Sequence, residues 1–157
     1  YGRDTQPTAL VALLRRVSEQ HRETGGFTEF IAMPRGGGAE RARDAAGFLD
    51  RARAVTAVAR LLLHDRVPHV QAAWPDLGLG AASAVLRAGA DDLGGTLLPG
   101  WGISAAEQSG LDDELLLAVS ARSARPLRQR DTRYEDPANP RPVSRTDRPR
   151  PLPESLR

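Results

Sequence analysis

The chain has 157 residues, with 22 basic and 20 acidic side chains and a formal net charge of +2. All of the basic residues are Arg, and no basic stretch alternates with aromatic residues, so the composition does not favour a nucleic-acid partner. Cysteine is absent, which excludes disulfides and thiolate-bound zinc or iron–sulfur sites within this chain.

The sequence predicts helices that alternate with short strand-like segments. Apolar residues at helical spacing predict helices over residues 7–23, 45–65, 79–89 and 111–124. Runs bounded by Gly or Pro predict strands over residues 25–31, 69–74 and 91–97. Residues 32–40 contain three consecutive glycines and are predicted to form a flexible loop.

The alternation of helices and strands predicts an α/β protein with a parallel sheet built from βα units. From Pro126 onward the chain holds seven of its twelve prolines and eight of its 22 arginines, with little apolar periodicity. Such a segment cannot bury enough surface to order itself, so residues 136–157 are predicted to be a disordered Pro/Arg-rich tail. About 125 residues remain for folding, fewer than the ~200–250 of a complete βα barrel.

No apolar run approaches the ~18 residues of a membrane-spanning helix, and no signal peptide is visible. We therefore expect a cytoplasmic protein with no membrane partner.

Glu29 stands at the centre of the first apolar run. Side chains alternate across a strand, so Glu29 shares a face with Phe27 and Ile31 and lies opposite Phe30. A buried, unpaired carboxylate is costly, which means that Glu29 needs a polar partner, a wet cavity or a ligand. The alternative is that Glu29 reaches solvent or pairs with an Arg at the end of the strand.

The other two strand-like segments also carry polar side chains, Gln71 in the second and Asp91 and Asp92 in the third. The carboxyl ends of the strands line the active-site mouth of a βα barrel. We therefore expect Glu29, Gln71 and Asp91 to point into one polar cavity at that end. The alternative is that local backbone groups satisfy each of them separately.

Gly94 and Gly95 follow Asp92 and lack side chains, so a ligand or a neighbouring backbone can approach closely there. A strand end of this kind commonly receives a polar group of a substrate. Alternatively, the glycines permit tight packing against the preceding helix and Asp92 caps a turn.

Three ordered blocks resemble a known family. These are Gly25-Gly26-Phe27-Thr28-Glu29-Phe30-Ile31, the Val70-Gln71…Trp74…Leu77-Gly78 block, and Gly89-Ala90-Asp91-Asp92-Leu93-Gly94-Gly95-Thr96-Leu97. Together they resemble the radical SAM enzymes of deazaflavin and menaquinone biosynthesis, and the Leu93–Thr96 run is most similar to the tyrosine-coupling half of the FO synthase family. The resemblance covers about residues 1–135.

The resemblance implies the C-terminal half of a TIM-type βα barrel over residues 1–135. It implies an enzyme that couples a 4-hydroxybenzyl group from tyrosine to 5-amino-6-ribitylaminouracil, with S-adenosylmethionine and a 4Fe–4S cluster as cofactors. The family holds its cluster by a CxxxCxxC motif, which this chain lacks. The chain is therefore expected to bind no metal and to be inactive without a cluster-bearing N-terminal half-barrel. By resemblance, substrate or S-adenosylmethionine is expected to contact Glu29, Gln71, Asp91, Asp92 and Thr96.

The sequence departs from the family pattern at several of these positions. Family members usually carry Asn where Asp91 stands, and the 35–44 loop is rich in Gly and Arg instead of apolar and aromatic residues. A second hypothesis is therefore a non-catalytic, decayed or repurposed paralogue that acts as a binding or interaction module.

Overall fold

A computed structural model describes residues 1–94 and 113–138, and the chain divides into two compact units between Gly94 and Gly95. The first unit contains, in chain order, α1 (Pro7–Thr24), β1 (Glu29–Ile31), α2 (Gly37–Arg43), α3 (Ala45–Leu63), β2 (His69–Gln71), α4 (Trp74–Leu77) and α5 (Leu79–Arg87). The described part of the second unit contains α7 (Asp113–Ser123). All four predicted helices are therefore present, with ends that differ from the prediction by a few residues.

Local sequence features explain both ends of α1 and the beginning of α3. Pro7 stands in the first turn of α1, where its missing N–H is not needed, and Gly25 ends the helix with a left-handed φ of 61°. Asp44 caps α3, because its Oδ1 accepts a hydrogen bond of 3.0 Å from the N–H of Gly47. This bond lowers the pKa of Asp44 below its ordinary value, helped by the nearby guanidinium groups of Arg3 and Arg51.

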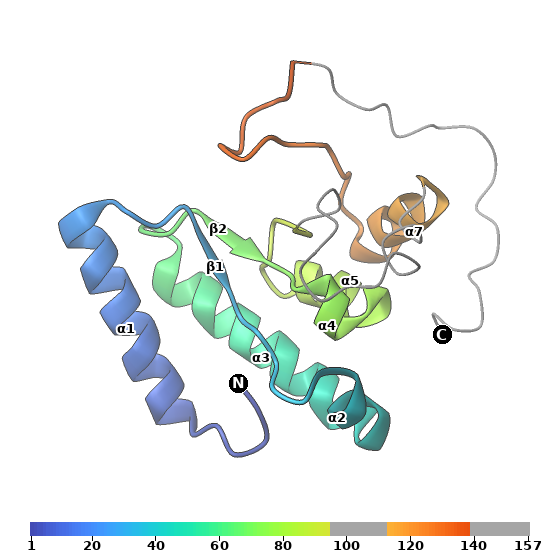
Figure 1. Cartoon of the computed structure of the whole chain (residues 1–157), viewed down its shortest axis with the longest axis horizontal. Helices are drawn as coiled ribbons and strands as arrows, with labels where there is room; N and C mark the ends of the chain where they lie inside the picture. The colour runs from blue at the N-terminus through green and yellow to red at the C-terminus, as the bar shows by residue number, and fades with distance from the viewer. Residues whose placement is uncertain (95–112, 139–157) are drawn as a thin grey trace. The chain divides into compact units, whose positions relative to one another are not determined.

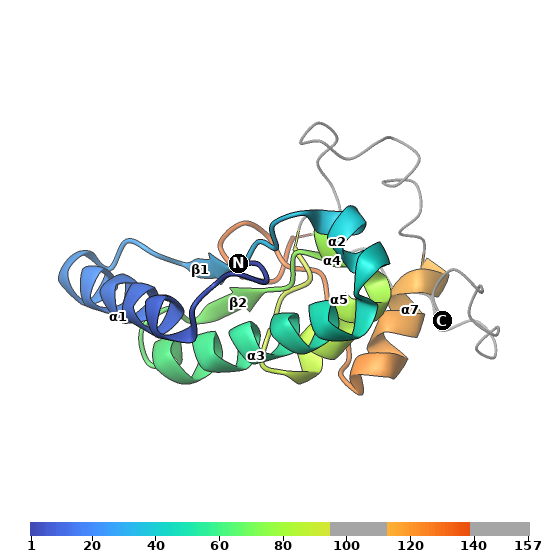
Figure 2. The same cartoon turned by 90° about the horizontal axis from the view of Figure 1, so that it is seen from below.

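The core of the first unit lies between α1, α3 and one face of the strands. Leu14 of α1 and Ala59 and Leu63 of α3 are fully buried together with Val67, and Phe30 of β1 packs against them. Burying a side chain such as Leu contributes about 1.5–3 kcal/mol, so this cluster is the main attachment of α1 to α3. Figure 2 shows the strands over one side of the two helices.

The sheet is parallel, with β1 beside β2 and Phe30 opposite Val70. A single parallel bridge between Gln71 and Asp92 adds the start of the third predicted strand on the other side of β2. The helix α3 connects β1 to β2, so the pair and its crossover form the expected βα arrangement. The described residues thus show a mixed α/β unit with a small parallel sheet.

Three local predictions differ from the structure. Residues 37–43 form the helix α2 instead of a loop, because α2 packs on its neighbours and Arg41 donates a 3.1 Å hydrogen bond to the carbonyl of Asp76. Tertiary contacts of this kind outweigh the poor helix propensity of glycine. The first two strands are shorter than predicted, and Trp74 begins α4 instead of ending β2.

In the second unit, a tight turn follows α7. The Asp131 Oδ1 atom accepts hydrogen bonds from the backbone N–H groups of Arg133 at 2.7 Å and Glu135 at 2.9 Å. Both bonds lower the pKa of Asp131, and the bond from the Glu135 N–H has the larger effect. The Arg130 guanidinium stacks on the Tyr134 ring at 4.0 Å from its centroid, which further fixes the turn.

Some predictions fall on residues outside this description. Thr96 and the last three residues of the third predicted strand lie in residues 95–112, and most of the predicted tail lies in residues 139–157. Within the described residues, none of the helices combines the length and the apolar character needed to cross a lipid bilayer.

Candidate functional site

The register of the sheet gathers polar side chains on the face that points away from α1 and α3. Glu29 is opposite His69 across the β1–β2 ladder, and Gln71 is bridged to Asp92. Because paired residues of parallel strands project to the same side, these side chains share a face, while Phe30 and Val70 point to the core. The alternation predicted for Glu29, Ile31 and Phe30 is therefore confirmed.

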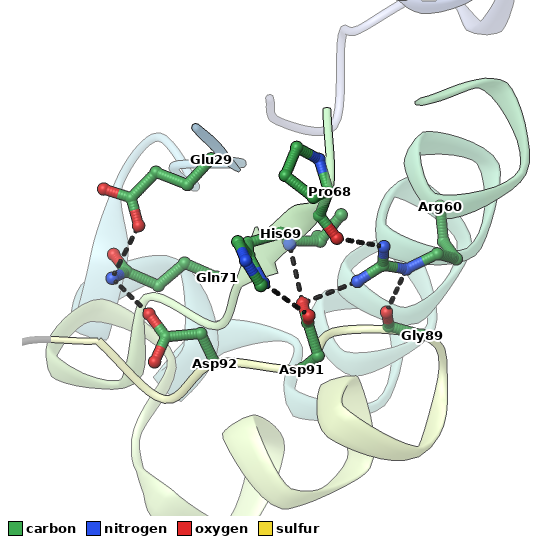
Figure 3. Close-up of polar contacts among 9 residues, drawn as sticks. Glu29, Arg60, Pro68, His69, Gln71, Gly89, Asp91 and Asp92 are labelled. Atoms are coloured by element: carbon green, nitrogen blue, oxygen red, sulfur yellow. Dashed lines mark hydrogen bonds and ion pairs between the residues drawn. The ribbon is translucent and has the colours of Figure 1, made fainter. Parts of the chain in front are cut away.

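Gln71 joins two carboxylates, and we call Glu29, Gln71 and Asp92 the acceptor cluster. The Gln71 Nε2 atom donates to Asp92 Oδ2 at 3.0 Å and, more weakly, to Glu29 Oε2 at 3.5 Å. Figure 3 shows the Gln71 amide between the two acidic side chains. Both hydrogens of the amide nitrogen are directed to carboxylates, which leaves the amide oxygen to face elsewhere. A carboxylate offers about four lone-pair positions, so each has more accepting capacity than Gln71 uses.

Gly94 makes room for the Gln71 amide. Its φ of +83° lies in the left-handed region, and a Cβ placed on it would stand 2.7 Å from Gln71 Cδ. Any side chain at this position would collide with the amide and strain the backbone. The sequence predicted the approach of a ligand or a neighbouring backbone at Gly94, and within the described residues the group that lies against it is the side chain of Gln71.

A second cluster lies beside the first, and we call Arg60, His69 and Asp91 the clamp. The Arg60 guanidinium donates to Asp91 Oδ1 at 2.6 Å, to the Gly89 carbonyl at 2.7 Å and to the Pro68 carbonyl at 2.9 Å. The remaining Asp91 oxygen, Oδ2, lies 2.9 Å from His69 Nδ1. Figure 3 shows the Arg60 side chain extending from α3 to Pro68, which precedes β2, and to Gly89, which precedes Asp91.

Asp91 is tied to the backbone as well as to side chains. Its Oδ1 accepts a 2.7 Å hydrogen bond from the N–H of Val70, in addition to the bond from Arg60. The side chains of Arg60 and Asp91 are 24% and 32% exposed, so solvent weakens the pairing less than it would at the open surface. The clamp thus fastens the start of β2 to the segment that carries Asp92.

The structure brings together two of the three side chains that we expected in one cavity. Glu29 and Gln71 meet through the Gln71 amide, but Asp92 completes the group instead of Asp91. Asp91 is directed to Arg60 and His69, because a guanidinium and a backbone N–H satisfy its charge there. Glu29 is also the first residue of β1, so it does not lie at the carboxyl end of that strand.

Arg60 was not singled out from the sequence. It lies on α3 next to the buried Ala59, and no spacing or motif distinguishes it from the other arginines. A cation one position from a buried helical stripe was the only available signal. No local pattern distinguishes His69 either, because its bond to Asp91 joins residues that are 22 positions apart.

The chain offers no thiolate ligand for an iron–sulfur cluster. It contains no cysteine, and the described residues hold no group of three or more His, Asp or Glu side chains placed to bind a metal ion. Iron–sulfur clusters are held by thiolates, so the residues present do not fit such a cluster.

Comparison with known proteins finds consistent relatives. The chain is 38% identical to the FO synthase of Streptomyces coelicolor over 167 aligned residues, which covers 99% of this chain and 19% of that protein. It is 38% identical to the FO synthase of Mycobacterium tuberculosis over 144 residues, covering 85% of the chain. It is 33% identical to the 5-amino-6-(D-ribitylamino)uracil--L-tyrosine 4-hydroxyphenyl transferase of Methanopyrus kandleri over 147 residues, covering 86% of the chain and 39% of that protein.

No family model matches the chain, and no solved structure matches it. The sequence similarities nevertheless relate the chain to an aminouracil–tyrosine transferase. More narrowly, the chain is homologous to part of FO synthase, which confirms the resemblance inferred from the three sequence blocks. It spans about a fifth of the first FO synthase and about two fifths of the transferase.

Proposed function

We propose that this chain is a substrate-holding part of an FO-synthase-like radical SAM enzyme in deazaflavin coenzyme biosynthesis. The observation that carries the proposal is its similarity, over 86% of its length, to a transferase named for the tyrosine–aminouracil step alone. The reaction is the coupling of a 4-hydroxybenzyl group from tyrosine to 5-amino-6-ribitylaminouracil. The similarity to a protein named for this single step favours the tyrosine-coupling half of FO synthase.

In the proposed enzyme, residues 1–135 belong to the C-terminal part of a βα barrel. The parallel strands with α1 and α3 on one face are compatible with this arrangement, because in a barrel the helices cover the outside and the other face lines the interior. The acceptor cluster lies on that other face. Gln71 is the last residue of β2, and barrel enzymes hold their substrates at the carboxyl ends of their strands, which supports a binding role for this residue.

The acceptor cluster suits a ligand that donates hydrogen bonds. Glu29 and Asp92 are carboxylates joined by the neutral amide of Gln71, so the group offers acceptors and negative charge. Hydroxyl groups of a ribityl chain, ribose hydroxyls of S-adenosylmethionine and the ammonium group of tyrosine all present such donors. In this enzyme, the cluster binds and orients one of these groups.

The chemistry that depends on the iron–sulfur cluster belongs to another part of the enzyme. The chain has no cysteine to ligate iron, so we assign it no role in forming the radical. It requires an N-terminal half-barrel that carries the CxxxCxxC motif, and alone it is not catalytic. The similarity to FO synthase and to the transferase favours this function over that of a non-catalytic paralogue.

The experiment is a reconstitution. The 157-residue chain is combined with a CxxxCxxC-bearing N-terminal half-barrel, iron, sulfide, S-adenosylmethionine, tyrosine and 5-amino-6-ribitylaminouracil, and the products are analysed by chromatography and mass spectrometry. We expect a coupled product only when both halves are present. Absence of product from a half-barrel that forms its cluster and binds this chain would contradict the proposal.

A variant pair tests the site within that experiment. Asp92→Asn is expected to raise the KM of the substrate held by the cluster about tenfold, or about 1.4 kcal/mol, because one charged acceptor is lost. Glu23→Gln, at an exposed position near the end of α1, is the matched control and is expected to leave KM unchanged. Equal KM values for both variants would remove Asp92 from the binding site.

A further inference from the structure

We infer that Trp74 is a binding residue whose indole N–H donates a hydrogen bond to a ring carbonyl oxygen of the aminouracil substrate. The choice of substrate rests on the proposed function, whereas the donor itself is observed in the structure. Trp74 is only 8% exposed, and its Nε1 atom is buried. Within the part of the chain that the structure describes, no acceptor lies within hydrogen-bond distance of this atom.

A buried donor without an acceptor is unusual. Such a group loses its hydrogen bonds to water and gains none in return, and the great majority of buried polar atoms in folded proteins are paired. The buried hydroxyls of Thr56 and Ser83, for comparison, donate to the carbonyls of Ala52 and Leu79 at 2.8 and 2.9 Å. The Trp74 indole is therefore a donor that an oxygen atom from a ligand would satisfy.

The backbone holds Trp74 in place, so a loose segment does not explain its unpaired N–H. The backbone N–H of Trp74 donates to the Ala72 carbonyl at 2.7 Å, and the intervening Ala73 has φ of −71° and ψ of 68°, which are the angles of an inverse γ-turn. The Trp74 carbonyl accepts a 2.7 Å hydrogen bond from the N–H of Gly78. A donor whose backbone is fixed in this way loses little conformational entropy when a ligand binds.

Trp74 follows the carboxyl end of β2 and is linked to a segment of the acceptor cluster. The strand ends at Gln71, and the next N–H, that of Ala72, donates to the Asp92 carbonyl at 2.7 Å. Figure 1 shows α4, which Trp74 begins, beyond the arrowhead of β2. In βα barrels, the connections that follow the strands build the substrate site. The indole donor and the acceptor cluster are thus carried by adjoining segments at one strand end.

A neutral donor in a buried position suits a neutral acceptor. A carboxylate held there by the indole alone would be a buried charge without a cationic partner, which is unfavourable. Of tyrosine, S-adenosylmethionine and the aminouracil, only the aminouracil carries an uncharged carbonyl oxygen. The same molecule carries ribityl hydroxyls, which can donate to the carboxylates of the acceptor cluster. Its ring and its side chain therefore match the two kinds of group at this strand end.

The first experiment removes the N–H and keeps the shape of the side chain. The full 157-residue chain with Trp101→Phe, which leaves Trp74 as its tryptophan, is produced with either tryptophan or benzothienylalanine, in which sulfur replaces the indole N–H. Removing a buried donor that has no acceptor breaks no hydrogen bond, so we expect the urea midpoint to stay the same or to rise. A lower midpoint would show that the N–H already has a partner within the protein, and the inference would be wrong.

The second experiment observes the N–H by NMR. The Trp101→Phe chain is labelled with ¹⁵N at its indole nitrogen, and spectra are recorded for the chain alone and with the N-terminal half-barrel. We expect 5-amino-6-ribitylaminouracil to move the Trp74 indole proton downfield, because a hydrogen bond deshields the proton. Ribitol, which has the hydroxyls but no ring, is the control and is expected to cause no shift. A shift with tyrosine or S-adenosylmethionine in place of the aminouracil, or no shift in either preparation, would overturn the inference.

Affinity measures the contribution of this single bond. We expect the Kd of the aminouracil for the assembled complex, measured by equilibrium dialysis, to be about fivefold higher with benzothienylalanine than with tryptophan, as for the loss of one neutral hydrogen bond. The Kd of tyrosine should be the same in both proteins. Equal changes for the two ligands, or none for the aminouracil, would contradict the assignment.

None of these measurements requires the iron–sulfur cluster or turnover. A reconstitution that forms no coupled product would therefore leave the Trp74 donor standing. Conversely, an aminouracil that binds without moving the Trp74 proton would leave the proposed reaction standing.

Discussion

The acceptor cluster and the clamp share two chain segments, β2 and residues 91–92, yet their charges are balanced differently. In the clamp, the Asp91 carboxylate meets the Arg60 guanidinium, the Val70 N–H and the His69 ring. In the acceptor cluster, the group that joins the two carboxylates is a neutral amide. Figure 3 shows that the adjacent residues Asp91 and Asp92 contact different side chains, Arg60 and His69 in one case and Gln71 in the other.

This difference assigns the two clusters to different tasks. A carboxylate that accepts charged and backbone donors at 2.6–2.9 Å is already used by the fold. The two carboxylates of the acceptor cluster are instead joined by a neutral amide, which does not balance their charge. The clamp is thus expected to determine stability, and the acceptor cluster is expected to determine binding.

The largest effect is expected at the centre of the clamp. Arg60→Ala removes three hydrogen bonds and leaves Asp91 without its guanidinium partner, so the free energy of unfolding should fall by about 2–3 kcal/mol. Urea denaturation measures this change. Arg53→Ala, on the same helix, removes only an exposed 3.8 Å pair with Asp50 and should change stability by less than about 0.5 kcal/mol. Equal losses in the two variants would show that the clamp is not structural.

A smaller effect is expected at Gly94. Gly94→Ala places a Cβ at 2.7 Å from Gln71 Cδ on a backbone with φ of +83°, and we expect a loss of about 2 kcal/mol together with displacement of the amide. The control is Gly25→Ala, where φ is +61° but no atom lies within 4 Å of the added carbon. That variant carries only the backbone strain and should lose about 1 kcal/mol. If the two losses were equal, the Gln71 amide would not be packed on Gly94.

The sharpest comparison of the two clusters uses residues 91 and 92 themselves. Asp91→Asn removes the charge that faces Arg60 and should cost about 1–2 kcal/mol of unfolding free energy. Asp92→Asn keeps an oxygen that can accept from Gln71 and should cost less than about 0.5 kcal/mol. Thermal and urea unfolding of both variants, measured in one buffer, give the two losses of unfolding free energy. A reversed order would exchange the roles assigned to the clusters.

Much of this fold could be predicted from the sequence, because its signals are local. The apolar spacing of Leu10, Leu14 and Val17 defines α1, and Gly25 ends it by a conformation that glycine adopts without strain. The alternation of side chains along β1 correctly predicted that Glu29 and Phe30 lie on opposite faces, because this too is a local signal. The helix α2 was missed because its stability comes from packing and from the Arg41 contact with the Asp76 carbonyl, which no local pattern reveals.

The site was predicted less completely, because it depends on which of two neighbouring residues makes a given contact. Asp91 and Asp92 are adjacent and chemically identical, and the sequence does not say which of them meets Gln71. The choice is made by Arg60, which is 31 positions from Asp91 and pairs with its carboxylate. The carboxyl-end rule for strands also failed at Glu29, because β1 begins at that residue instead of ending near it.

The smallest expected effect lies at the opposite end of α3 from Arg60 and concerns acidity. The Gly47 N–H, together with Arg3 and Arg51, holds the pKa of Asp44 below its ordinary value, so the folded protein favours the ionised carboxylate. The unfolded chain then binds more protons in the window between the two values, and the stability contributed by Asp44 is lost as the pH falls through its folded-state pKa. At neutral pH this contribution is fully present.

Asp44→Asn tests that sign directly. Asn is as good a cap as Asp, so the variant should begin α3 in the same way but should have no carboxylate to titrate. Denaturation midpoints of the two proteins are compared from pH 7 down to about pH 3, with salt held constant. We expect the wild-type advantage to be steady near neutrality and to shrink below the ordinary carboxylate range. A difference that stayed constant over the whole series would show that Asp44 is equally acidic in the folded and unfolded states.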